Sequence, residues 1–151
     1  MNALSSGGCE LTAALRFVFG RNILRVEPMD DFSQLMPLQL LAVHARITDE
    51  LRSRGITRSV NNPTGDLAEY LFCKAFGWKQ AENSNSNVDA IGLDQLRYQI
   101  KGRRMTRHNN SRQLSALRDL RDARFDFLAG VLFAEDYSVN ACRDHPLCRC
   151  A

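Results

Sequence analysis

The chain has 151 residues, of which 44% are apolar and 25% are charged, and its net charge is +3. This composition is that of a folded globular protein with one modest core, and it excludes disordered, fibrous and collagen-like chains. No apolar run reaches the length of about 18 residues that a membrane helix needs. Three arginines (Arg16, Arg21 and Arg25) interrupt the N-terminal apolar segment, which therefore does not read as a secretory signal. We expect a cytoplasmic protein with no membrane partner.

The five cysteines are an odd number, and three of them lie in the last ten residues. Such an uneven set does not predict a disulfide framework. Together with His145 the tail, CRDHPLCRC, offers metal ligands, but their spacing matches no established zinc pattern. We therefore expect an atypical Cys-rich tail over residues 140–151. One domain over 32–139 would precede it, after a poorly ordered lead-in over 1–31.

Two helices are predicted in the first half of the chain. Apolar residues recur three and four positions apart between residues 37 and 54, which predicts an amphipathic helix that ends at the following glycine. The segment NNPTGDLAEYLFCKAFGW predicts a second helix, with Asn62 as its cap and Gly77 as its end. Apolar residues surround most of this helix, so it should be buried. Glu69 lies on its apolar surface, where a carboxylate is unfavourable unless a positive group meets it.

A β-hairpin is predicted next, in the segment NVDAIGLDQLRYQIKGRR. A short strand over 88–91 is followed by turn residues over 92–95. The residues from 96 to 103 then alternate, which places Gln99 and Lys101 on the same face of a second strand.

The last third of the chain predicts a short basic helix over 112–124 and a buried strand, FDFLAGVLFA, over 125–134. A further strand can begin at Ser138. Together these elements predict an α/β (α+β) fold, in which helices flank a small mixed sheet with a central hairpin.

Basic residues are concentrated after the predicted hairpin. Residues 101–124 carry eight Lys or Arg and two Asp, a net charge of +6. Such a block suits a polyanion such as DNA, although a solvated helix face would have the same composition. Phosphate contacts position the polymer without reading its sequence, so we expect little sequence specificity. The residues that we predict to contact phosphates are Arg103, Arg104, Arg107 and Arg112.

The hairpin carries groups that suit phosphodiester hydrolysis, which needs a divalent cation, an activated water and a positive charge for the developing anion. Asp89, Gln99 and the Ile100 carbonyl are oxygen donors of the kind that magnesium binds. Lys101 shares a strand face with Gln99 and could hold the water or the phosphate. Glu69, on the buried helix, could reach the same pocket.

The order Gly65-x-x-x-Glu69, then Asp89, then Gln99-x-Lys101 resembles the PD-(D/E)xK phosphodiesterase superfamily, which has the restriction-endonuclease-like fold. It is most similar to the Mrr-like branch, which carries a QxK element. The resemblance covers roughly residues 33–139 and implies a metal-dependent DNA endonuclease. It implies that Glu69 and Asp89 bind magnesium, with manganese as an alternative, and that Lys101 acts on the attacking water. A homodimer that cuts both strands is one arrangement consistent with it.

Two residues depart from the family pattern. Val88 stands where a proline is expected before the aspartate, and Gln99 stands where other members have an acidic ligand, which removes one negative charge from the site. A second function therefore remains open: a nucleic-acid-binding module that keeps the scaffold without catalysis.

Each charged candidate also has a purely structural interpretation. Asp89 can be a turn former at the end of a strand. Glu69 can pair with a neighbouring arginine such as Arg58, and Lys101 can be a charge that protects an edge strand from aggregation.

Overall fold

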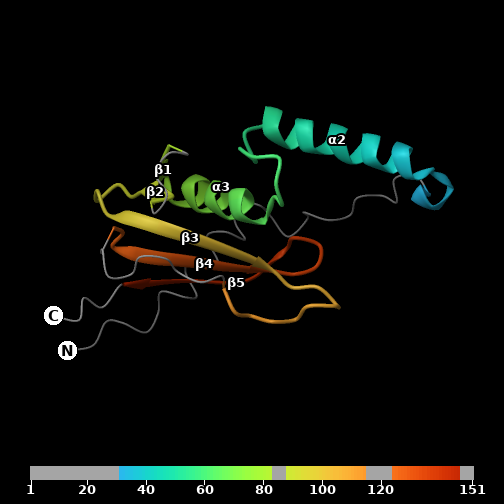
Figure 1. The fold of residues 1–151 in the computed structure, drawn as a ribbon. Helices are drawn as coiled ribbons and strands as arrows, with labels where there is room; N and C mark the ends of the chain where they lie inside the picture. Colours follow the sequence, from blue (N-terminus) through green and yellow to red (C-terminus); the bar gives the residue numbers. More distant parts are fainter. Residues whose placement is uncertain (1–30, 83–87, 115–123, 147–151) are drawn as a thin grey trace.

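The computed structural model describes residues 31–82, 88–114 and 124–146, with the backbone only for 143–146. It has a mixed α/β fold, as predicted (Figure 1). A turn of 3-10 helix and two α-helices precede or flank a five-stranded sheet. In chain order the elements are η1 (Phe32–Gln34), α2 (Pro37–Ser53), α3 (Thr64–Phe76), β1 (Lys79–Gln80), β2 (Ala90–Ile91), β3 (Arg97–Arg104), β4 (Phe127–Phe133) and β5 (Val139–Pro146).

The sheet has the strand order β1-β2-β3-β4-β5. The first three strands form an antiparallel meander, and the predicted hairpin is its β2–β3 half, with Ala90 opposite Tyr98. Strand β4 runs parallel to β3, and β5 returns antiparallel to β4. Two features differ from expectation. The two-residue strand β1 was not predicted, and β5 continues the sheet to Pro146, beyond the domain end predicted at residue 139.

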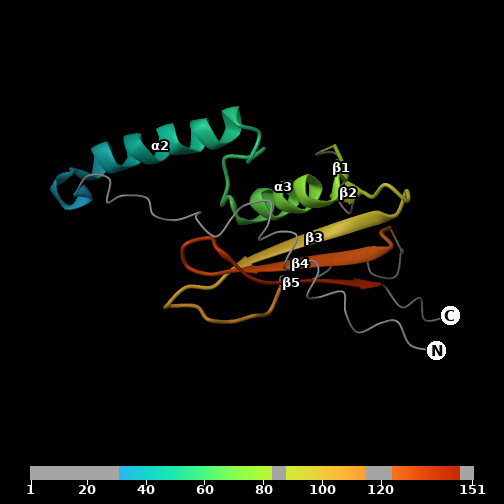
Figure 2. The ribbon, with the colours of Figure 1, turned by 180° about the vertical axis from the view of Figure 1, so that it is seen from behind.

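Helix α3 covers one face of the sheet (Figures 1 and 2). Its buried residues Ala68, Leu71 and Phe72 pack in one cluster with side chains of β3 and β4. The approach is close at Gly102, where a Cβ atom would lie 2.6 Å from the Thr64 carbonyl oxygen. A side chain at that position would force the helix away from the strand. The members of the cluster from the sheet are Ala90, Tyr98, Ile100, Ala129, Val131, Phe133 and Cys142.

Aromatic rings fill the end of this core beneath the C-terminus of α3. The Trp78 ring stacks on Tyr98 with centroids 3.8 Å apart, and on Phe72 at 5.7 Å. Tyr98 is thus a core residue, and the partly buried Trp78 packs against it.

The ends of α3 follow from local sequence. The helix begins one residue later than predicted, and Asn62 caps it from outside by accepting the Thr64 N–H at 3.0 Å. It ends at Gly77, whose φ of 65° is the left-handed conformation that favours glycine at this position.

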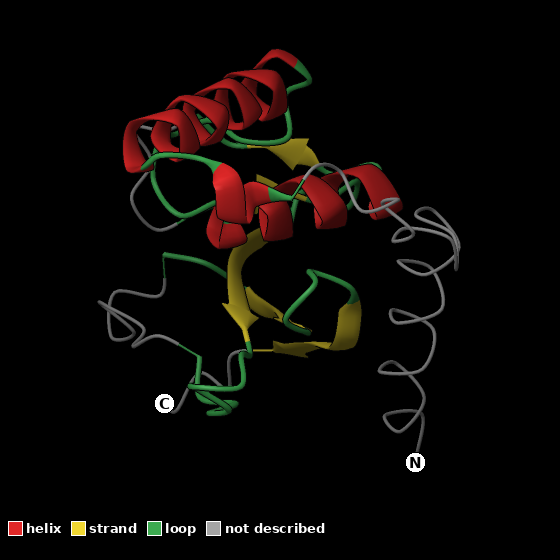
Figure 3. Cartoon of the chain, turned by 90° about the vertical axis from the view of Figure 1, so that its right-hand side faces the viewer, coloured by secondary structure: helices red, strands yellow, loops and turns green. Residues whose placement is uncertain are grey.

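Helix α2 forms as predicted but extends away from the sheet (Figure 3). None of its residues is buried, and Leu41 and Ile47 are 63% and 53% exposed. The predicted apolar stripe is therefore present, yet no other described element covers it. Neither of the two described α-helices combines the length and the hydrophobicity that crossing a bilayer requires.

Two other predictions fall on parts of the chain that the structure does not describe. Most of the basic helix predicted over 112–124 lies there, and residues 112–114 have no regular secondary structure. The lead-in predicted over 1–31 also lies outside the described residues except for Asp31.

Candidate active site

The first component of the site is Asp89, at the point where β2 and β3 stop pairing. The two strands pair at Ala90 and Ile91. One residue earlier, Asp89 Oδ2 accepts the backbone N–H of Ile100 at 2.6 Å, while the Asp89 N–H donates to the Tyr98 carbonyl at 2.8 Å. A side-chain carboxylate thus takes the place of a backbone carbonyl beside β3. The carbonyl of Ile100 leaves the strand on the same side as its N–H, so two kinds of oxygen donor face this edge.

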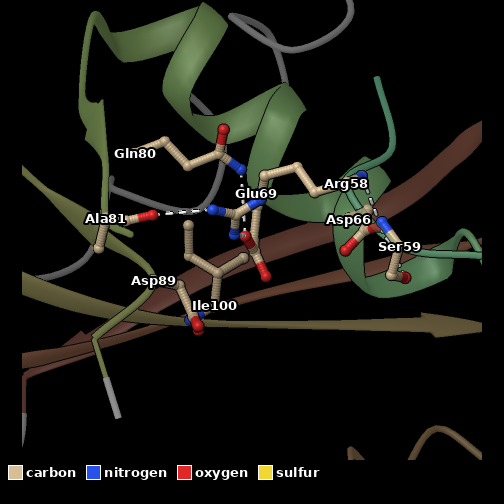
Figure 4. Close-up of polar contacts among 8 residues, drawn as sticks. All are labelled: Arg58, Ser59, Asp66, Glu69, Gln80, Ala81, Asp89 and Ile100. Atoms are coloured by element: carbon tan, nitrogen blue, oxygen red, sulfur yellow. Dashed lines mark hydrogen bonds and ion pairs between the residues drawn. The ribbon is translucent and has the colours of Figure 1, made fainter. Parts of the chain in front are cut away.

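Glu69 approaches the same edge from α3, and its side chain is 13% exposed. Its Oε2 forms an ion pair with Arg58 Nη2 and accepts a hydrogen bond from Gln80 Nε2 at 3.1 Å (Figure 4). The pairing of Glu69 with Arg58, one of the structural interpretations of the sequence, is confirmed. The Arg58 guanidinium is the positive group that makes a carboxylate tolerable on this apolar helix face.

Arg58 is held in place by its backbone as well as by its side chain. Asp66 Oδ2, in the first turn of α3, accepts the N–H groups of Arg58 and Ser59 at 2.8 and 2.9 Å and the Ser59 hydroxyl at 3.0 Å. The guanidinium also donates from Nη1 to the Ala81 carbonyl at 2.8 Å (Figure 4). Its third donor, Nε, is buried and has no hydrogen-bond partner among the described residues.

The pKa values of the two carboxylates are both raised. Burial raises the pKa of Asp89, an effect opposed by the Ile100 N–H and by the charges of Lys101 and Arg58. Burial also raises the pKa of Glu69, and the charge of Asp89 raises it further. Cys73, one turn along α3, has a pKa raised to about 11 by burial and by Glu69, so its thiol is a poor nucleophile. A further cation would stabilise this pair of carboxylates.

Gln99 and Lys101 lie on the other face of the sheet. Tyr98 and Ile100 belong to the core under α3, so the alternation of β3 turns Gln99 and Lys101 to the opposite face. Gln99 is 4% exposed, and its Oε1 is buried without a hydrogen-bond partner among the described residues. Lys101 is half-buried, and its charge interacts with that of Asp89.

The structure therefore brings the Asp89 carboxylate to the Ile100 N–H, and the charge of Asp89 interacts with Glu69 and Lys101. Gln99 lies on the far face of the sheet and makes no contact with the two carboxylates. Strand β3 is third of five in the sheet order, but among the described residues β2 pairs with it only at Arg97 and Tyr98, so the interpretation of Lys101 as an edge-strand charge stays a prediction.

The donors suit a hard divalent cation, although they are few. Among the described residues, no group of three or more His, Cys, Asp or Glu side chains is arranged to hold a metal. Two half-buried carboxylates and a backbone carbonyl are nevertheless oxygen ligands. They match the preference of magnesium and manganese, and magnesium usually keeps several waters. Glu69, Asp89 and the Ile100 carbonyl would hold the ion, whereas the predicted ligand Gln99 lies on the face opposite α3 and does not join them.

The predicted DNA-contacting arginines lie at and beyond the C-terminal end of β3. Arg103 Nη2 donates to Asn109 Oδ1 at 3.1 Å. Arg104 donates to the Glu135 carbonyl at 2.8 Å and lies over the Tyr137 ring. Arg107 forms an exposed ion pair with Glu135 at 3.2 Å, and Arg112 is exposed. Since Glu135 offsets part of this charge, Arg103 and Arg112 are the more available of the four.

Two residues of the site were not predicted from the sequence. Gln80 lies on the two-residue strand β1, which is too short to give a periodic signal. Asp66 had a usable signal, because an aspartate in the first turn of a helix commonly accepts backbone N–H groups near the helix start.

A comparison of the chain with models of protein families gave no match, and a comparison with curated proteins gave none either.

Proposed function

We propose that the chain is a metal-dependent nuclease that hydrolyses phosphodiester bonds in DNA, with little sequence specificity of its own. The observation that carries this proposal is the carboxylate of Asp89 at the point where β2 and β3 part, close enough for its charge to interact with Glu69 and Lys101. The order of helix, hairpin and mixed sheet agrees with the restriction-endonuclease-like core that the sequence resemblance implies.

The site residues have distinct roles in this proposal. Asp89 and Glu69 supply the negative charge that holds magnesium or manganese, and the bound ion would polarise the phosphate and acidify a water. The Ile100 N–H fixes the orientation of the Asp89 carboxylate. Lys101 supplies an ammonium that orients the attacking water or stabilises the charge that develops on the phosphate. Gln99 stands where the family pattern has a third carboxylate, so the site carries one negative charge fewer.

DNA is the substrate that the surrounding charge favours. The arginines lie at and beyond the end of β3, the strand that carries Lys101, so a DNA backbone bound along them would lead into the site. A cytoplasmic location and a homodimer that cuts both strands belong to the same proposal.

The test is cleavage of several DNA forms (duplex, single-stranded and branched) with and without magnesium, using the wild-type chain, Asp89→Asn and Lys101→Ala. Asparagine keeps an oxygen that can accept the Ile100 N–H, so the strands should stay in place while the charge is lost. We expect magnesium-dependent cleavage by the wild type and a loss on the order of 10²- to 10³-fold or more in each variant. Undiminished cleavage in both folded variants would refute the proposal.

A second candidate is a nucleic-acid-binding module without catalysis, and the Arg58–Glu69 ion pair favours it because Glu69 already has a cation. This candidate predicts salt-sensitive DNA binding and no magnesium-dependent product. Turnover that disappears in Asp89→Asn would exclude it.

A further inference from the structure

Arg58 lies where the charge of the candidate metal would act. Its guanidinium is paired with Glu69, and its charge also interacts with Asp89. It therefore supplies to both proposed ligands the positive charge that a divalent ion would supply. Its side chain is 26% exposed, so the charge is only partly screened by water.

The contacts of Arg58 hold its side chain in position but leave one of its hydrogen-bond donors without an acceptor in the described part of the chain. The loop that carries it is fixed to α3 through Asp66, and Nη1 is fixed to the Ala81 carbonyl. The buried Nε, in contrast, has no acceptor among the described residues. A buried guanidinium donor without a partner is unfavourable, and a phosphate oxygen near the site would satisfy it.

We propose that Arg58 is the counter-cation of the metal-free site, so that a divalent ion must displace its guanidinium from Glu69 in order to bind. This inference rests on the proposed function, because it concerns the metal of the same site. Two cations cannot share one carboxylate oxygen at no cost, since the guanidinium and the metal repel each other at short range. Metal affinity is then lower than the two carboxylates alone would give.

The displaced guanidinium also gains a role. A DNA phosphate at the metal would be an anion that could accept its donors, including Nε, which has no partner among the described residues. Metal binding and DNA binding should therefore be cooperative. The metal frees the Arg58 guanidinium for a phosphate, and the phosphate holds the guanidinium away from Glu69.

The first experiment measures Mn²⁺ affinity by calorimetry at pH 8 without DNA. The variants are Arg58→Met, Asp89→Asn and a matched control, Arg97→Met. Arg97 lies at the start of β3, and the control removes its guanidinium from the Asp126 carboxylate. We expect Arg58→Met to bind Mn²⁺ on the order of tenfold more tightly than the wild type, Arg97→Met to bind as the wild type does, and Asp89→Asn to bind far more weakly.

The outcomes separate the two proposals. If Asp89→Asn loses the metal while Arg58→Met binds it no more tightly than the wild type, the displacement inference is wrong and the metal site stands. If no variant and no wild-type sample binds Mn²⁺, both fail.

A second measurement does not depend on the folding of a variant. The Nε–H resonances of Arg58 and Arg97 can be followed by NMR in the wild type during a titration with Mg²⁺. Displacement predicts a shift of the Arg58 resonance at the same metal concentration that fills the site, with the Arg97 resonance unchanged. An Arg58 signal that stays constant as metal binds would overturn the inference.

Discussion

Two arginine–carboxylate pairs flank the strand that carries the candidate site, and they are built differently. Arg97 meets Asp126 on the β4 side of β3, and Arg58 meets Glu69 on the β2 side. Asp126 accepts three hydrogen bonds from Arg97, from the backbone N–H at 2.9 Å and from Nε and Nη2 at 3.0 Å. This forked contact closes the start of the parallel β3–β4 pairing, and the Asp126 N–H returns a bond to the Arg97 carbonyl at 2.8 Å.

The Arg58 pair lacks this closure. Only one nitrogen of the guanidinium meets Glu69, another reaches a backbone carbonyl, and Nε has no partner among the described residues. The second carboxylate, Asp89, is close enough to raise the pKa of Glu69. One pair thus satisfies its donors and joins two strands. The Arg58–Glu69 pair leaves one guanidinium donor, Nε, without an acceptor among the residues that the structure describes and a second carboxylate, Asp89, beside the first, as expected where a ligand completes the arrangement.

The largest effect on stability should come from the closed pair. Asp126→Asn removes the charge and at least one of the accepted hydrogen bonds, and leaves a guanidinium poorly paired. We expect a loss of about 1–3 kcal/mol in the free energy of unfolding, measured by urea denaturation. Cleavage per folded molecule should stay within a few-fold of the wild type, because Asp126 lies on the other side of β3 from Asp89. A variant with full stability and no activity would reverse the assignment of the two pairs.

A smaller effect should appear in the pH dependence of stability at the open pair. The pKa of Glu69 is raised in the folded chain, so the folded state holds its proton to higher pH than the unfolded chain does. The stabilisation that this gives is complete below the ordinary pKa of about 4.5 and is lost as the pH rises through the folded value. Glu69→Gln has no such loss. The stability of this variant relative to the wild type should therefore increase from pH 4 to pH 7.

Asp136 provides a control of opposite sign for that measurement. Hydrogen bonds from Ser138 lower the pKa of Asp136, so its contribution is present above the ordinary pKa of 3.8 and is lost as the pH falls through the lowered value. Asp136→Asn should therefore differ from the wild type by a constant amount between pH 5 and pH 7. Parallel curves for Glu69→Gln and the wild type would show that burial does not raise the Glu69 pKa.

The fold was predictable from the sequence where local patterns decide it. The α3 sequence carries its own cap and stop, and the alternation through Tyr98 and Ile100 gave the hairpin. The candidate carboxylates were predictable because each lies next to a recognisable element. The remaining features depend on tertiary contacts. No periodicity reveals that β1 exists, that β5 continues the sheet to Pro146, or that α2 leaves its apolar stripe uncovered.

The same limit applies within the site. Arg58 appeared in the sequence only as one of several arginines that could meet Glu69. Its selection depends on Asp66, which fixes the loop, and on the Ala81 carbonyl, and both contacts bring together segments that are separate in the sequence. Strand alternation also predicts that Gln99 and Lys101 share a face, but not that this face is opposite to α3.

The smallest effect should be found at Arg103, where the positive charge is available for a phosphate and is not committed to a carboxylate. Its one side-chain contact among those described is the Asn109 amide, so Arg103→Ala should change stability little. If Arg103 contacts one DNA phosphate, its removal should weaken binding of all sequences equally and lower the slope of log K against log salt by about 0.9. Arg54→Ala, at the C-terminal end of α2, is the control, because the exposed side chain of Arg54 already pairs with Glu50 one turn earlier. Equal slopes for both variants and the wild type would place the DNA path elsewhere than along the end of β3. In that case the Arg58–Glu69 ion pair would not lie beside bound DNA, and the charged groups around it would act only on the metal.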